Sequence, residues 1–146
     1  MKKLLVAVPI LLAAGGCVPE HPPAPEEVAI DRYGEGEKLF AAGKYTDAAI
    51  EFEYDVKARP RWKAPYLLLA SCHEHLHHEG DAIAVLERLL KVDSTDDDAL
   101  KGLGRLYAGQ GDAAHALDAL RRFKALHPDD RSLDGEIARL EAMRKP

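Results

Sequence analysis

The residues best suited to chemistry form a histidine-rich run near the middle of the chain. Residues 72–78 read Cys-His-Glu-His-Leu-His-His and contain the pattern His73-Glu74-x-x-His77. On a helix, residues four apart share one face, so this pattern presents two imidazoles with a carboxylate beside them. Such a group can hold zinc and activate a water molecule. One hypothesis is therefore a metal-binding protein or a zinc-dependent hydrolase that uses segment 73–78.

Other features of the sequence argue against catalysis. Zinc proteases with this motif carry an apolar residue after the Glu, where this chain has His75. No later segment supplies a clear third ligand, and the chain has no phosphate-binding loop and no nucleophile motif. The sequence therefore predicts no enzyme, no cofactor and no bound metal, with His73 and His77 kept as alternative metal ligands. The histidine run is interpreted as the solvated end of a helix.

The first residues resemble a targeting segment. Lys2 and Lys3 precede an apolar run over 4–14, which is shorter than the roughly 20 residues needed to cross a bilayer. A positive start followed by a short apolar run is typical of a secretory signal peptide. We expect residues 1–16 to be removed.

The end of that run resembles the lipobox of bacterial lipoproteins. It reads Ala14-Gly15-Gly16-Cys17, with small residues directly before the cysteine. The resemblance implies that Cys17 becomes the new N-terminus and carries the acyl chains that anchor the protein. Several acyl chains on one residue give a stable membrane anchor.

The residues after Cys17 indicate a spacer and a destination. Residues 17–28 contain four prolines, which favour an extended tether between the lipid and the folded part. Val18 stands where Asp retains lipoproteins in the inner membrane of enteric bacteria. The expected location is therefore the periplasmic face of the outer membrane.

The charge of the chain excludes one class of partner. Without Lys2 and Lys3 the basic residues number 20 − 2 = 18 against 25 acidic residues, a net charge of −7. A negative surface without a basic stripe repels phosphate backbones, so we expect no nucleic acid.

A period of 34 residues organises the rest of the sequence. Pro60 and Pro128 lie two periods apart, and small and large apolar residues recur at fixed distances before them. The small positions are Gly36, Ala70 and Gly104 in one series and Ala48, Ala82 and Ala116 in another, and the large ones are Phe52, Leu86 and Leu120. Small residues let helices approach closely, and large residues fill the remaining space. The pattern predicts stacked helix pairs.

These positions resemble the tetratricopeptide repeat, and the third repeat matches best through Leu103-Gly104, Tyr107, Ala116 and Pro128. The resemblance implies an all-α fold, an α-α solenoid of three helix pairs. Its repeats span 29–130, as 29–62, 63–96 and 97–130, and a capping helix lies in 131–146. The expected helices are 29–42, 46–58, 64–78, 81–92, 97–109, 112–126 and 132–144.

The turns and helix starts can also be assigned within the paired helices. We expect glycines to mark the turns and small polar residues to cap the second helices. The predicted turn residues are Gly43, Gly80 and Gly111, and the predicted caps are Thr46, Asp81 and Asp112.

In this repeat family the first helix of each pair lines a concave surface that binds partner proteins. The resemblance places eight residues on that surface: Tyr33, Glu37, Phe40, Leu67, Ser71, Glu74, Lys101 and Arg105. Aromatic residues and Arg dominate binding energy in interfaces, so Tyr33, Phe40 and Arg105 are the expected anchors. They suit a peptide or helix with apolar anchors and a nearby acid.

One known binding mode is excluded by the residues present. Members that clamp the C-terminal carboxylate of chaperones carry basic residues in the third repeat, where this chain has Asp98 and Gly102. Together with the lipobox, the resemblance to this repeat family implies a lipid-anchored scaffold or adaptor for another protein segment, with a role in assembling an envelope complex.

Overall fold

Seven helices make up the part of the chain that the structure describes. The computed structural model describes residues 25–144, with side chains from residue 32 onward, and contains no strand in that range. The helices are α1 (Pro25–Ala41), α2 (Tyr45–Ala58), α3 (Lys63–His75), α4 (Glu79–Val92), α5 (Asp97–Gly109), α6 (Ala113–Leu126) and α7 (Asp134–Met143). The predicted signal peptide, Cys17 and most of the tether lie outside the described residues.

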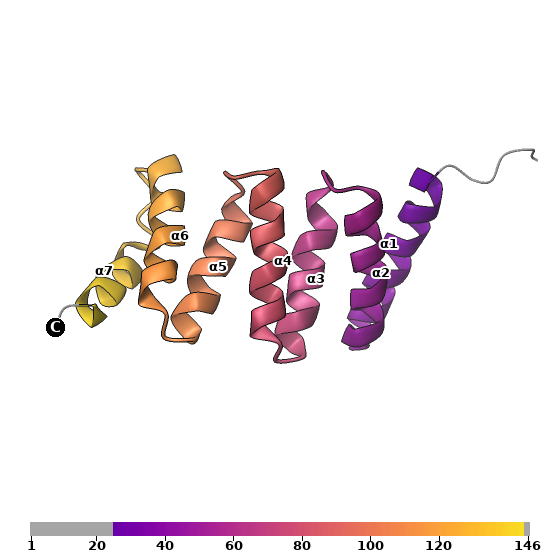
Figure 1. The fold of residues 1–146 in the computed structure, drawn as a ribbon, viewed down its shortest axis with the longest axis horizontal. Helices are drawn as coiled ribbons and strands as arrows, with labels where there is room; N and C mark the ends of the chain where they lie inside the picture. The colour runs from indigo at the N-terminus through magenta and orange to yellow at the C-terminus, as the bar shows by residue number, and fades with distance from the viewer. Residues whose placement is uncertain (1–24, 145–146) are drawn as a thin grey trace, which may run out of the picture.

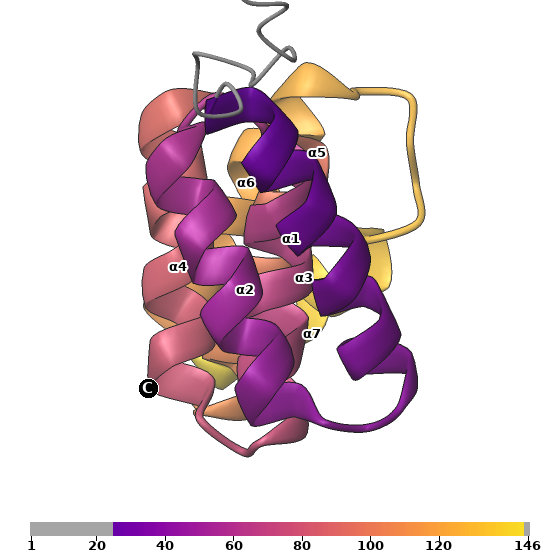
Figure 2. The same ribbon diagram turned by 90° about the vertical axis from the view of Figure 1, so that its right-hand side faces the viewer.

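The helices form an elongated row in chain order, as Figure 1 shows. Contacts between elements run mainly between helices that are neighbours in the sequence, from α1 against α2 to α6 against α7. Viewed along the row, α1, α3 and α5 lie on one side, and α2 and α4 lie on the other (Figure 2). This arrangement confirms the all-α solenoid of three helix pairs followed by a C-terminal helix.

The predicted pairing of small and large residues holds the helix pairs together. A Cβ atom added at Gly36 would meet the Phe52 ring at 2.7 Å, and one added at Gly104 would collide with Leu120. Phe52 and Leu120 are both buried. The residues that recur with the 34-residue period are therefore in contact. A small residue on the first helix leaves the space that the large residue of the second helix fills.

The turn in the second repeat differs from the prediction. Left-handed backbone conformations occur at Gly43, His77 and Gly111, with φ of 73°, 59° and 78°, one repeat length apart. Gly80 lies inside α4 instead, and α3 ends at His75, not residue 78. The sequence prediction assigned this turn to Gly80 because glycine favours left-handed conformations. The repeat length of 34 residues places the turn at His77 instead.

The helix caps follow the same spacing. The second helices begin after Lys44, His78 and Asp112, so Thr46 and Asp81 lie within helices and do not cap them. Of the three predicted caps, Asp112 is confirmed, because its side chain accepts a hydrogen bond from the backbone N–H of His115 at 3.1 Å.

Cys72 is buried in the core between the helices. Burial raises the pKa of its thiol to about 11. Because the thiolate is the reactive form, the buried thiol of Cys72 is expected to be inert.

A buried carboxylate interrupts the core of the first repeat. Asp55 is 0% exposed, and it stands one and two repeat lengths before the core residues Leu89 and Phe123. Neither of its oxygens has a hydrogen-bond partner among residues 32–144, and its nearest cation is the Arg59 guanidinium at 3.6 Å. Burial raises the pKa of Asp55, which Arg59 opposes and Glu51 reinforces.

The raised pKa of Asp55 predicts that ionisation of this carboxyl lowers the stability of the fold. A carboxyl whose folded pKa lies above the unfolded value of 3.8 stabilises the fold when protonated, and that contribution is lost as the pH rises through the folded pKa. We expect the Asp55→Asn variant, which cannot ionise, to gain stability relative to wild type between pH 4 and pH 7. Chemical unfolding of both proteins at the two pH values measures this difference, and a difference that does not change with pH contradicts the assignment.

Candidate functional site

The structure places the predicted binding residues on α1, α3 and α5, which we call the odd-helix face. From α1 come Tyr33, Glu37 and Phe40, from α3 Leu67, Ser71 and Glu74, and from α5 Lys101 and Arg105. The prediction that they come from the first helix of each pair is therefore confirmed. Their role in binding stays a prediction.

The two aromatic anchors predicted on this face pack within the fold. The Tyr33 ring centroid lies 4.4 Å from Trp62 and 5.8 Å from Phe52. The Phe40 ring centroid lies 5.3 Å from Tyr45 and 5.5 Å from His75. Both side chains are only partly exposed. Much of their apolar surface therefore already stabilises the array.

Arg105 is the exposed anchor of the odd-helix face, and it forms an ion pair with Glu74. Its guanidinium donates two hydrogen bonds to the Glu74 carboxylate, at 2.6 and 2.9 Å. The two residues line a cavity of about 370 Å³ between α3 and α5. Because the charges offset each other, a ligand acid must compete with Glu74 for Arg105.

A larger opening lies on the other side of the molecule, between α2 and α4, and we call it the α2/α4 groove. Its volume is about 730 Å³. The floor includes Leu69 of α3, and the walls include Ile50 and Tyr54 of α2 and Ala84 of α4. Ile50 is 61% exposed and Tyr54 is 41% exposed. The groove is therefore apolar at its centre and open to solvent.

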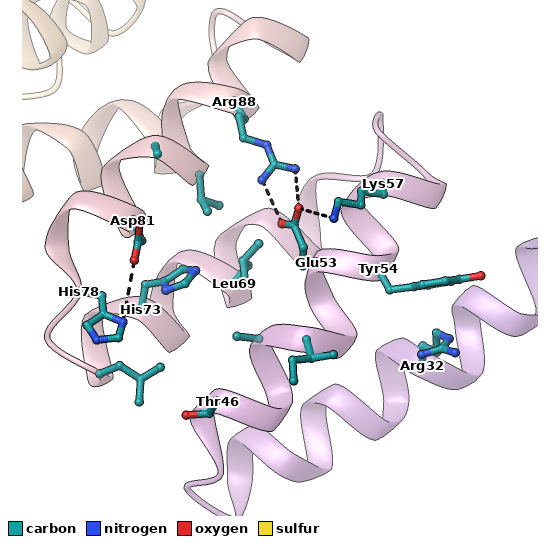
Figure 3. Close-up of a pocket in the computed structure, with 15 residues that line it drawn as sticks. Arg32, Thr46, Glu53, Tyr54, Lys57, Leu69, His73, His78, Asp81 and Arg88 are labelled. Atoms are coloured by element: carbon teal, nitrogen blue, oxygen red, sulfur yellow. Dashed lines mark hydrogen bonds and ion pairs between the residues drawn. The ribbon is translucent and has the colours of Figure 1, made fainter.

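Charged groups close one end of the α2/α4 groove. Figure 3 shows Glu53 between Arg88 and Lys57 at that end. The Arg88 guanidinium donates hydrogen bonds to Glu53 at 2.9 and 3.3 Å, and the Lys57 ammonium lies 3.4 Å from the same carboxylate. The Arg32 guanidinium lies 4.1 Å from the centre of the Tyr54 ring. Cations therefore outnumber carboxylates among the residues that line this end.

The corresponding groove between α4 and α6 lacks this character. Its volume is about 290 Å³, and its walls carry Glu87, Lys91, Asp118 and Arg122. Asp118 stands two repeat lengths after Ile50, so the exposed apolar residue of the first repeat is replaced by a charge in the third. The apolar opening is a feature of the first two repeats.

The sequence carried a signal for this groove. Ala48, Phe52 and Val56 form the buried stripe of α2, whereas Ile50 and Tyr54 lie four residues apart on another face. Two large apolar residues four apart and outside the core stripe indicate a second apolar face. The repeat positions Ala48 and Phe52 belong to the buried stripe, so the 34-residue period alone does not reveal this second face.

The histidine pair of the zinc hypothesis is not formed. α3 ends at His75, and the left-handed residue His77 lies beyond its end, so His73 and His77 do not share one helix face. The structure instead brings His73 together with His78 and Asp81, whose ligand atoms all lie within 4.8 Å of one another. The alternative ligand pair, His73 and His77, assumed a helix that continues to residue 78, and α3 ends at His75.

The described helices form a row of stacked pairs, which defines a helical-repeat protein. No protein-family profile matches the sequence. The Hsp70-Hsp90 organizing protein of Triticum aestivum is 26% identical over 111 residues, which cover 76% of this chain and 19% of that protein. The chain thus spans about a fifth of that curated relative.

Solved structures identify the repeat class. The first tetratricopeptide domain of Spaghetti (RPAP3), bound to an HSP90 peptide, matches with a TM-score of 0.68 and 18% identity, covering 80% of this chain and 92% of that one. The Yersinia enterocolitica secretion chaperone SycD, in complex with a YopD peptide, matches with a TM-score of 0.64 and 17% identity, covering 80% and 89%. The described part of the chain has the tetratricopeptide-repeat fold.

Proposed function

We propose that this protein is an adaptor that binds a segment of a partner protein in the α2/α4 groove while a lipid on Cys17 holds it in the cell envelope. The observation that carries the proposal is the exposure of Ile50 and Tyr54 over an apolar groove of about 730 Å³. Single exposed apolar residues are ordinary on protein surfaces. Two that share one groove with apolar walls are typical of an interaction site.

The lining of the groove suggests the chemistry of the partner. Ile50 and Tyr54 lie one helical turn apart and offer contacts for two apolar anchors on the partner. At the Tyr54 end, Lys57 and Arg88 share the Glu53 carboxylate and Arg32 pairs with Glu51 at 2.9 Å, so three cations meet two carboxylates. A helix or extended segment with two apolar anchors and an acidic residue at one end fits this arrangement.

Similar folds support binding of a protein segment. SycD has been solved with a translocator peptide and the Spaghetti domain with an HSP90 peptide. The clamp for a chaperone C-terminal carboxylate is missing from this sequence, so we propose an internal segment of a partner protein. We propose an envelope complex as the context, because the sequence resembles a lipoprotein.

Crosslinking in cells followed by affinity purification and mass spectrometry tests the adaptor. The wild type is compared with Ile50→Asp in the α2/α4 groove and with Arg105→Ala on the odd-helix face. A partner lost only with Ile50→Asp supports the proposed groove. A partner lost only with Arg105→Ala moves the site to the odd-helix face, and no captured partner contradicts the adaptor.

The lipid anchor has its own test. No helix within residues 25–144 is long and apolar enough to cross a membrane. We propose that attachment depends on acylation of Cys17 after removal of 1–16. We expect Cys17→Ser to move most of the protein from the membrane fraction to the soluble fraction of lysed cells. The Cys72→Ser variant, with its thiol buried in the helical array, serves as the control, and unchanged membrane association of Cys17→Ser would contradict the anchor.

A further inference from the structure

Three potential metal ligands meet at the end of the α2/α4 groove that is far from Glu53, as Figure 3 shows. His73 belongs to α3, His78 directly precedes α4, and Asp81 lies in the first turn of α4. One ligand atom of each lies within 4.8 Å of the others. The Nδ1 atom of His78 and a carboxylate oxygen of Asp81 are 3.9 Å apart. All three side chains line the groove.

The left-handed turn at His77 produces this cluster. It stops α3 and turns the chain back, so that the His78 backbone N–H donates to the His73 carbonyl at 2.9 Å. The imidazoles of residues 73 and 78 thereby come to the same side, with ring centroids 6.3 Å apart. A continued helix would have paired residues 73 and 77 instead.

The third repeat shows what these positions look like without metal ligation. One repeat length later stand Tyr107, Asp112 and His115. There the Asp112 carboxylate and His115 Nδ1 lie 2.6 Å apart, and the Tyr107 hydroxyl donates to Glu87 at 2.7 Å. These polar groups are all satisfied by one another or by a neighbouring carboxylate.

In the second repeat, the side chains at the equivalent positions do not form hydrogen bonds with one another. His78 and Asp81 are too far apart for a hydrogen bond, and the buried Nδ1 atom of His73 has no hydrogen-bond partner among residues 32–144. A buried polar atom without a hydrogen-bond partner lowers the stability of the folded state, so such atoms are rare and usually have a ligand or a functional role. Ligation through this nitrogen would supply its missing partner, and one ion shared with His78 and Asp81 would account for the convergence of the three side chains.

We propose that His73, His78 and Asp81 bind one divalent transition-metal ion of the zinc type. Two imidazoles suit zinc and its neighbours, whereas calcium and magnesium prefer oxygen ligands alone. Ligands of a tetrahedral zinc ion lie about 3.3 Å apart, as bond lengths near 2.0 Å require. Binding therefore requires the exposed His78 and Asp81 side chains to rotate until the ligand atoms reach that spacing.

A bound ion would add a binding position to the α2/α4 groove. Three protein ligands leave a fourth position of a tetrahedral ion free, and this position opens toward the α2/α4 groove because all three ligands line it. A His or carboxylate of a bound segment can occupy it. The same ion joins the end of α3 to the start of α4, which stabilises the second repeat.

Zinc titration of the purified, tag-free protein tests the site. Wild type is titrated with Zn²⁺ by isothermal calorimetry after treatment with a chelator, together with His73→Tyr and Asp81→Asn. Tyr occupies the position of His73 in the third repeat, so this substitution suits the fold. His77→Asn is the matched control, because Asn tolerates the left-handed conformation and residue 77 lies outside the cluster.

We expect wild type and His77→Asn to bind one equivalent of Zn²⁺ with the same affinity. We expect His73→Tyr and Asp81→Asn to bind at least about tenfold more weakly, since even partners outside the ligand shell change metal affinity by 10–100-fold. Circular dichroism of the metal-free proteins verifies that the variants are folded. Absence of saturable binding by wild type, or an equal loss with His77→Asn, would overturn the proposal.

The location of the ion can be verified directly. Imidazole nitrogen NMR signals of His73 and His78 should shift on adding Zn²⁺, while those of His75 and His77 stay in place. Neither measurement requires a partner protein, so a failure of the metal site and a failure of the adaptor proposal are distinguishable.

Discussion

Partner binding is expected to fall by roughly a hundredfold or more in the Ile50→Asp, Tyr54→Ser variant. Hot-spot residues, the minority that carries most of the binding energy, cost about 2 kcal/mol or more each when truncated, and we expect Ile50 and Tyr54 to be two of them. Asp at position 50 would also bring a charge into a groove whose centre is apolar, where it is desolvated without a partner cation. The affinity of the purified variant for the captured partner, measured by calorimetry, gives this result.

The same variant should remain folded. Ile50 and Tyr54 are 61% and 41% exposed and lie outside the buried stripe of α2. Surface substitutions usually change stability by about 0.5 kcal/mol or less. The matched control is Leu126→Asp, which places the same charge on an apolar residue that is 42% exposed on α6. Unchanged affinity of the groove variant, or an equal loss with Leu126→Asp, contradicts the proposed site.

Stability is expected to fall by about 3–5 kcal/mol in the Phe52→Ala variant. Phe52 is 0% exposed, faces Gly36 of α1 and lies 5.8 Å from the Tyr33 ring. Replacing its ring leaves a cavity that glycine cannot fill. Because small proteins are stable by only about 5–15 kcal/mol, this loss removes a large part of the total.

Trp62 offers a local probe of this loss. Its ring lies 4.4 Å from Tyr33 and 3.6 Å from the Arg59 guanidinium, at the junction of the first two repeats. Denaturant unfolding followed by Trp62 fluorescence reports on these repeats, and circular dichroism reports on the whole array. A loss below about 1 kcal/mol would contradict the role of Phe52 in the core.

A comparison with Leu120→Ala separates local from global unfolding. Leu120 faces Gly104 in the third repeat in the way that Phe52 faces Gly36 in the first. Repeat arrays are stabilised by contacts between neighbouring repeats. If the array unfolds as one unit, both variants lower the Trp62 midpoint. If the repeats unfold separately, Leu120→Ala leaves the Trp62 midpoint near that of wild type.

Repetition made the fold predictable from the sequence. Gly36, Phe52 and their equivalents recur at one spacing because each helix pair packs in the same way. A pattern that is weak in one repeat becomes recognisable because it occurs three times. The helices and the core therefore followed from the period. Asp55 was not recognised as a core residue, because a charged side chain at a core position carries no hydrophobic signal.

The sites were harder to predict for two physical reasons. His77 adopts a left-handed conformation that single-residue preferences assign to glycine, and only the repeat spacing from Gly43 and Gly111 would have revealed it. This one turn decides whether His73 meets His77 or His78. The α2/α4 groove depends on which surfaces neighbouring helices leave uncovered, and this is a property of the assembled array.

Site-specific photocrosslinking tests the adaptor function and its location most directly. A photoreactive amino acid replaces Ile50 in the α2/α4 groove or Asp118, the equivalent residue two repeats later on α6, in proteins expressed in intact cells. We expect a discrete crosslinked partner from position 50 and none from position 118. Absence of a crosslink from position 50, or the same products from both positions, would contradict the claim that this groove binds a partner protein.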